Sequence, residues 1–128
     1  MPKRRFNIIV KAEKVADYTL TATDKSPKKL RCDLVPELRK QAFRILEDIV
    51  RANCLDVDGE KATESTRETR RALQEDALAT LRVLDSFAEM ANKHNYLTSK
   101  QFEYLTLLTQ ELYDMVKNWI VSDAKRKG

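Results

Sequence analysis

Apolar side chains recur every three or four positions in four stretches of this chain, and polar side chains fill the positions between them. The clearest stretch runs from Leu97 to Ile120. Because an α-helix turns once in about 3.6 residues, this spacing places the apolar side chains on one face and predicts an amphipathic helix that needs partner helices. Its expected inward residues are Phe102, Leu105, Thr109, Leu112, Val116 and Trp119.

The start of this helix has the strongest local signal in the sequence. Thr98 is followed three residues later by Gln101. The threonine hydroxyl can accept a hydrogen bond from the backbone N–H of Gln101, while the glutamine side chain reaches back to the N–H of Thr98. This is the capping-box arrangement, and it predicts that the helix begins directly after Thr98.

Three earlier stretches repeat the helical pattern. The first is weaker. Its expected inward row is Ile9, Ala12, Ala16 and Leu20, and Ile8, Val15 and Thr19 lie beside this row. The second is expected to end near Asn53 and to face inward with Leu34, Leu38, Ala42, Ile45, Ile49 and, at the margin, Val50. The third is expected over about residues 66–93, with Leu73, Ala77, Leu81, Leu84, Ala88 and Ala91 facing inward.

Two breaks separate the first three helices. The segment around Pro27 combines a Ser-Pro step with four basic residues, and proline disfavours helical backbone in the residue before it. A mild break would instead leave the first two helices partly continuous. Asp33 is the expected N-cap of the second helix, with Pro36 in its first turn. Between about residues 55 and 65 the apolar pattern disappears, so a mobile loop is expected.

Four helices with short connections predict an all-α, up-down-up-down four-helix bundle formed by a single domain of 128 residues. The apolar arcs of the last three helices are wider than one stripe. Such arcs either pack inside one bundle or are covered when copies of the chain associate, and both alternatives are open at this point. The apolar residues beside the main rows are Phe43, Phe87, Leu107, Leu108, Met115 and Ile120.

Composition agrees with long solvated helices, since 34% of the residues are charged and only two are glycine. No apolar run approaches the roughly 20 residues of a membrane span, and no apolar segment follows the basic start as in a secretory signal. We therefore expect a soluble, cytoplasmic protein. Cys32 and Cys54 fall near opposite ends of the second helix, about 33 Å apart, and are expected to be free thiols.

The sequence lacks the common catalytic and metal-binding motifs. It has no Gly-rich phosphate loop, no HExxH motif and no nucleophile elbow. The single histidine, His94, and two distant cysteines cannot form a structural zinc site. Asp56, Asp58 and Glu60 lack the remaining ligands of a calcium-binding loop. We therefore expect no catalytic residue, no metal site and no cofactor.

Adjacent carboxylates occur twice, at Glu47–Asp48 and at Glu75–Asp76. Neighbouring residues point about 100° apart on a helix, so neither pair can work as a facing acid and base without help from elsewhere. Solvated partners of nearby arginines are the expected role. This expectation also favours a non-enzymatic protein.

Positive charge is concentrated in the first part of the chain. Residues 1–51 carry 13 Lys or Arg against 7 Asp or Glu, whereas residues 52–128 carry 11 against 13. A basic surface favours a polyanion such as RNA or DNA, bound through its phosphates with little sequence readout. The alternative is an ordinary soluble helical protein whose charges are only solvated.

The candidate nucleic-acid-binding residues form a ridge on the second helix and three clusters at chain ends and a turn. Lys40, Arg44 and Arg51 make the ridge, since they fall within about 40° of one another around a helix. Glu47 lies on the same ridge and is expected to pair with Arg51. The complete candidate set is Lys3, Arg4, Arg5, Lys25, Lys28, Lys29, Arg31, Lys40, Arg44, Arg51, Lys125, Arg126 and Lys127.

The stretch Ala77–Ile120 resembles a known group of proteins. It is similar to the Avd-type four-helix bundle proteins, which are accessory variability determinants of diversity-generating retroelements, and to relatives encoded in bacterial 23S rRNA intervening sequences. The earlier segments DYTLTATDKSPKKLR and EDIVRANC resemble a branch of this group. Lys117 and Asn118 depart from it, because the family often has a small residue before the terminal Trp. The matched residues are Leu97, Thr98, Gln101, Phe102, Glu103, Trp119 and Ile120.

This resemblance implies a homopentameric barrel with a basic surface. In retroelement members the barrel partners a reverse transcriptase, binds nucleic acid and supports mutagenic reverse transcription without being the polymerase. The resemblance therefore implies a non-enzymatic accessory protein whose partners are copies of itself, a reverse transcriptase and RNA or DNA. The alternative is a structural interaction protein of the intervening-sequence type with no reverse transcriptase partner.

Overall fold

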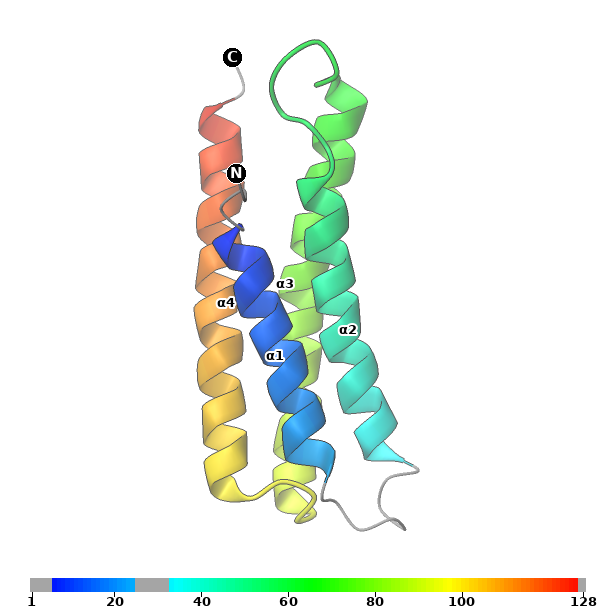
Figure 1. Cartoon of the computed structure of the whole chain (residues 1–128), viewed down its shortest axis with the longest axis vertical. Helices are drawn as coiled ribbons and strands as arrows, with labels where there is room; N and C mark the ends of the chain where they lie inside the picture. Colours follow the sequence, from blue (N-terminus) through cyan, green and yellow to red (C-terminus); the bar gives the residue numbers. More distant parts are fainter. Residues whose placement is uncertain (1–5, 25–32, 127–128) are drawn as a thin grey trace, which may run out of the picture.

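The four amphipathic stretches of the chain form helices in the computed structural model, which describes residues 6–24 and 33–126. The helices run side by side, with successive helices in opposite directions (Figure 1), and no strand occurs in the described ranges. The predicted all-α, up-down-up-down four-helix bundle is therefore confirmed for a single copy of the chain. The helices are α1 (Asn7–Asp24), α2 (Leu34–Asn53), α3 (Glu64–Lys93) and α4 (Ser99–Lys125).

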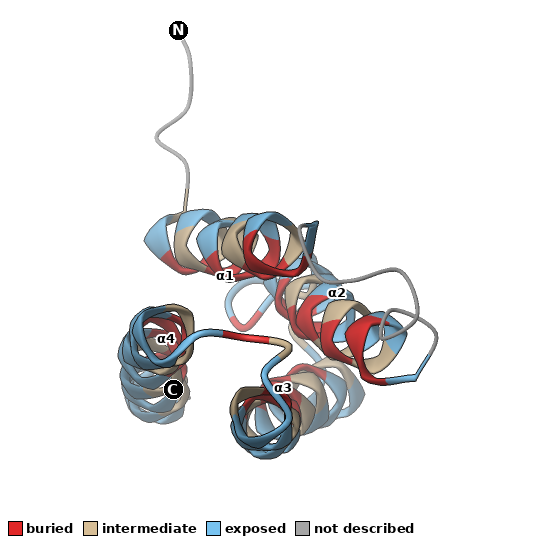
Figure 2. Ribbon diagram, turned by 90° about the horizontal axis from the view of Figure 1, so that it is seen from below, coloured by how far each residue is buried: buried red, intermediate tan, exposed pale blue. Residues whose placement is uncertain are grey.

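Each helix packs against two neighbours, so that α1, α2, α3 and α4 close a ring in chain order. Seen from the end in Figure 2, the buried faces of all four helices point to the centre of this ring. Enclosing one Leu or Ile side chain stabilises a fold by about 1.5–3 kcal/mol, so the shared core holds the four helices together. Its large, fully buried members include Leu38, Ile45, Ile49, Leu81, Leu84, Leu105, Leu108 and Leu112.

The inward rows predicted for α3 and α4 are buried, except that Leu73 and Phe102 lie half-buried at the core edge. Leu108 is a correction, because it belongs to the core and not to a surplus apolar arc. The reason is that α4 packs against both α1 and α3, so it buries a wide face. Of the other residues expected beside the rows, Phe87, Met115 and Ile120 are half-buried, whereas Phe43 and Leu107 are exposed.

The buried face of α1 is rotated relative to the predicted row. Ile9 and Leu20 are only half-buried, whereas Thr19 and Thr23 are buried. These threonines can enter the core because their hydroxyls donate to backbone carbonyls one turn earlier, at 2.8 and 2.7 Å. On α2, the marginal inward assignment of Val50 is wrong, since this residue lies on the outer side and is exposed.

The capping box at the start of α4 is confirmed. The N–H of Gln101 donates to Thr98 Oγ1 at 3.1 Å, and the N–H of Thr98 donates to Gln101 Oε1 at 2.9 Å. Asp33 occupies the N-cap position of α2, as predicted, but its backbone is already helical and its side chain makes no capping hydrogen bond. Pro36 does lie in the first turn of α2, as predicted.

The connections place the chain ends as the up-down topology requires. α1 and α2 are separate helices, and the predicted break around Pro27 lies outside the described residues. α3 begins at Glu64, earlier than expected, because Thr63 Oγ1 accepts from the N–H of Thr66 at 3.1 Å. The start of α1 and the end of α4 meet at one end of the bundle (Figure 1), where the rings of Phe6 and Trp119 lie 5.0 Å apart. None of the described helices is long and apolar enough to cross a membrane.

Candidate nucleic-acid interface

The structure locates only part of the predicted basic set. The candidates within the described ranges are Lys40, Arg44, Arg51, Lys125 and Arg126, and all of them are exposed. The first three lie on α2 and the last two at the end of α4, so the described candidates form two separate groups. The remaining candidates lie outside the described residues: Lys3, Arg4, Arg5, Lys25, Lys28, Lys29, Arg31 and Lys127.

Two of the three cations on the α2 ridge are engaged by carboxylates. Arg51 Nη2 lies 2.9 Å from Glu47 Oε1, which confirms the predicted pair. Arg44 donates from Nε and Nη2 to the two carboxylate oxygens of Asp76 on α3, both at 3.1 Å. Lys40 makes no ion pair within the described ranges. The local field of the ridge is therefore weaker than its count of basic residues predicts.

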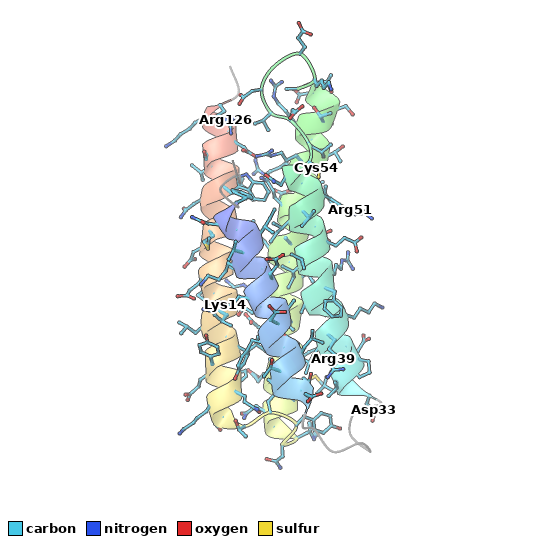
Figure 3. All side chains as sticks on the ribbon, in the orientation of Figure 1. Lys14, Asp33, Arg39, Arg51, Cys54 and Arg126 are labelled. Carbon is cyan, nitrogen blue, oxygen red and sulfur yellow. The ribbon has the colours of Figure 1, made fainter. Side chains whose placement is uncertain are left out.

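Arg39 is a cation that the sequence reasoning missed. Its Nε donates to Thr23 Oγ1 of α1 at 2.9 Å, and it has no carboxylate partner among residues 6–24 and 33–126. Figure 3 shows Arg39 toward the α1 side of α2. Arg39 lies about 100° around the helix from Lys40, so the helical periodicity of the ridge did not include it. Its position directly before Lys40 was the one signal available in the sequence.

Arg39 and Lys40 flank a hollow on the outer side of α2. We call this surface the α2 hollow; its lining residues are Pro36, Arg39, Lys40, Phe43, Arg44, Glu47 and Asp48. Phe43 is 46% exposed there. Cations beside an exposed ring are typical of surfaces that bind single-stranded nucleic acid, where phosphates meet the cations and a base stacks on the ring.

The second group of described candidates, Lys125 and Arg126 at the end of α4, is partly engaged in an ion pair within the bundle. Arg126 forms an ion pair with Asp58 of the connection between α2 and α3, and Figure 3 shows Arg126 beside this connection. Lys125 is exposed and has no ion pair within the part of the chain that the structure describes. The end of α4 therefore offers one unpaired described cation.

A buried ion pair anchors the same end of the bundle. Arg70 of α3 donates from Nε and Nη2 to Asp123 of α4 at 2.7 and 2.8 Å. Its Nη1 donates to the carbonyl of Leu55 at 2.7 Å, and its guanidinium lies 4.9 Å from the ring centre of Trp119. Gln74 Nε2 also donates to Asp123, at 2.9 Å. This network joins α3, α4 and the loop, and its role is structural.

A cavity of about 340 Å³ lies beside that network, between α3 and α4. Its apolar wall includes Val57 and Ile120, and its polar wall includes Arg67 and Gln74. Its lining contains neither a histidine nor a cysteine, serine or threonine. The cavity therefore offers no nucleophile with an adjacent base, which is the grouping that acyl transfer requires.

One carboxylate from each of the two adjacent acidic pairs meets the other across the helices, which the sequence did not predict. Asp48 of α2 and Asp76 of α3 are hydrogen-bond neighbours in the seam between these helices. Burial raises the pKa of Asp48 to about 7, and the hydrogen bond to Asp76 adds to the rise. The hydrogen bond from Asp48 and the guanidinium of Arg44 lower the pKa of Asp76. Glu47, Glu75 and Asp76 each pair with an arginine, as predicted. Asp48 does not, and its contact with Asp76 depends on how α2 packs against α3, which the sequence does not show.

Other chemistry-bearing residues lie apart. No group of three or more His, Cys, Asp or Glu side chains in the described ranges could hold a metal ion. His94 is exposed at the C-terminal cap of α3, and Cys54 is an exposed free thiol after α2. No protein-family model and no curated protein matches the chain.

Proposed function

We propose that this chain is a non-enzymatic accessory protein of a diversity-generating retroelement, which assembles as a homopentameric barrel and binds RNA or DNA and a reverse transcriptase. The observation that supports binding is the α2 hollow, where Arg39 and Lys40 carry charges without described carboxylate partners beside the exposed ring of Phe43. The likeness of Ala77–Ile120 to Avd-type proteins is the basis for the pentamer and the polymerase partner.

Binding at this surface is expected to depend on phosphate contacts. Each phosphate that a Lys or Arg neutralises releases a condensed counterion, so affinity falls steeply as salt rises. The partly neutralised ridge limits the number of contacts, because Arg44 and Arg51 already bind carboxylates. The basic residues outside the described ranges, such as Lys28 and Lys29, add further contacts in this proposal.

Self-association is supported by apolar side chains that one copy leaves in water. Val83 and Met90 are two turns apart on the same side of α3, with the half-buried Phe87 between them. A patch of this kind is typical of a protein–protein contact. The exposed apolar residues of α2, α3 and α4 are Phe43, Val50, Val83, Met90, Tyr104, Leu107 and Val121.

Fluorescence anisotropy with labelled single-stranded RNA, single-stranded DNA and duplex DNA tests the binding. We expect affinity to drop at least ten-fold between about 50 and 200 mM salt and to change little with sequence. The double variant Arg39→Ala, Lys40→Ala should weaken binding and reduce the salt slope, whereas Lys117→Ala on α4 is the matched control. Binding at this surface would be refuted by an affinity that changes neither with salt concentration nor in the Arg39→Ala, Lys40→Ala variant.

A second basic region can be tested in the same assay. The quadruple variant Lys25→Ala, Lys28→Ala, Lys29→Ala, Arg31→Ala removes the cations between α1 and α2. We expect weaker binding without loss of helical circular dichroism, because none of these residues belongs to a described helix. Unchanged affinity would remove this cluster from the proposal.

Co-purification with a reverse transcriptase encoded beside the gene tests the remaining partner. A stable complex is the expected result. Nucleic-acid binding without any polymerase complex would favour the alternative, a stand-alone interaction protein of the intervening-sequence type.

A further inference from the structure

Two carboxyl groups from different helices meet in the seam between α2 and α3. Asp48 is 8% exposed, and its Oδ2 atom is buried with no hydrogen-bond partner among the described residues. Asp76 is its hydrogen-bond neighbour from α3. Arg44 holds Asp76 through two hydrogen bonds of 3.1 Å, and neither of them reaches Asp48.

A proton resolves this arrangement. Two ionised carboxylates cannot hydrogen-bond to each other, since both only accept. One proton makes one carboxyl a donor to the other and leaves a single negative charge beside Arg44. In such a close pair the proton belongs to the pair and not to either residue.

The charged groups around Asp48 come from α2 and α3 alone. On α2, Arg44 favours ionisation of Asp48, whereas Glu47 opposes it; on α3, Asp76 opposes it. No charged residue of α1 or α4 in the described ranges contributes to this balance. Among the described residues, Arg44 is therefore the one cation that favours the ionised form of Asp48.

We propose that Asp48 and Asp76 share one proton at and below neutral pH, and that losing it loosens the α2–α3 seam and adds a negative charge to the α2 hollow. Asp48 and Arg44 both line that hollow, so the change in charge occurs where the phosphates would bind. The effect on phosphate binding rests on the proposed nucleic-acid function. The effect on the seam does not.

The direction of the pH effect follows from the raised pKa. The pKa of Asp48 rises from 3.8 to about 7 on folding. Its protonated form therefore stabilises the folded state fully below pH 4, and this stabilisation is lost as pH rises toward and through 7. The lowered pKa of Asp76 acts only below about pH 4, where the folded state loses the stabilising charge on that residue. Between pH 5.5 and 8.5 the contribution of Asp48 to stability therefore falls as pH rises.

Thermal unfolding at pH 5.5, 7.0 and 8.5 tests the shared proton. We expect the Tm of the unaltered protein to fall by about 5 °C across this range. Asp48→Asn should abolish the fall, because its amide can donate to Asp76 without ionising. Glu47→Gln, at the adjacent exposed position, should retain it. A fall that is equal in all three proteins would overturn the proposal.

A second readout needs no substitution, so it holds if Asp48→Asn fails to fold. Carboxyl ¹³C NMR of the unaltered protein should show the Asp48–Asp76 pair losing a proton with a midpoint near pH 7. Titration of both carboxyls near pH 4 would contradict the shared proton.

Binding to single-stranded oligoadenylate, whose bases do not titrate between pH 6 and 8.5, separates this inference from the proposed function. At low salt, affinity should fall about three-fold with rising pH in the unaltered protein and remain constant in Asp48→Asn. Binding with the same pH dependence in both proteins would refute the regulation and leave the function standing. An absence of binding at every pH, with the Tm result as expected, would refute the function and leave the shared proton standing.

Discussion

Arg70 shows how a charged residue can become part of the core. Its side chain is 9% exposed and that of Asp123 is 13% exposed. Removing two charges from water is costly, and their hydrogen bonds offset this only when both partners are present. The partners lie on α3 and α4, far apart in sequence, so helical periodicity alone could not identify them.

The buried pair predicts a large effect of a small substitution. Asp123→Asn should lower the free energy of unfolding by about 3 kcal/mol, because Arg70 keeps its buried charge and loses its counterion. Urea denaturation measures this loss. Glu75→Gln is the control, since it breaks the exposed pair with Arg71 and should cost less than about 1 kcal/mol. Equally small losses in both variants would show that the Arg70 pair is not buried in solution.

At the scale of elements, apolar spacing predicted all four helices. The end of α2 at Asn53, the end of α3 at Lys93 and the capping box of α4 are all confirmed. The rotation of α1 and the role of Asp33 were not predictable. Both depend on where a neighbouring segment lies, and in α1 on threonines that bond to their own helix. Local propensity cannot rank such buried threonines above the larger Ile9 and Leu20.

Alanine substitution is expected to have different effects at the two N-cap residues, Thr98 and Asp33. Thr98→Ala should destabilise the protein by about 1 kcal/mol, because it removes the hydroxyl that accepts from the N–H of Gln101. Asp33→Ala should have almost no effect, since Asp33 makes no capping bond. Thermal or urea unfolding of both variants measures the difference. A loss at Asp33 that matches the loss at Thr98 would mean that Asp33 caps α2 in solution.

At the scale of the whole molecule, charge counts identified basic segments but could not show which cations are paired with carboxylates. Arg44 and Arg126 are engaged by Asp76 and Asp58, which lie in other parts of the chain. Arg39 was not among the predicted nucleic-acid-binding residues, because it faces α1. The sequence therefore predicted a basic surface on α2. The α2 hollow and the Asp48–Asp76 contact could not be predicted from it, because both depend on how the helices pack.

The exposed apolar residues of α2, α3 and α4 predict assembly of several copies. Replacing Val83 and Met90 together by lysine should disrupt the assembly, because the contact would then bury two charges. Val10→Lys is the control, since Val10 is similarly exposed but lies on α1, outside the proposed contact. Size-exclusion chromatography of the two variants compares their effects, and equal elution of both with the unaltered protein would remove this patch from the contact.

Light scattering of the unaltered protein at micromolar concentration is the most direct measurement of the proposed barrel. We predict a mass near five times the 14.9 kDa of one chain. A monomer of 14.9 kDa at that concentration would contradict the barrel and leave the exposed apolar residues of α3 and α4 without a role.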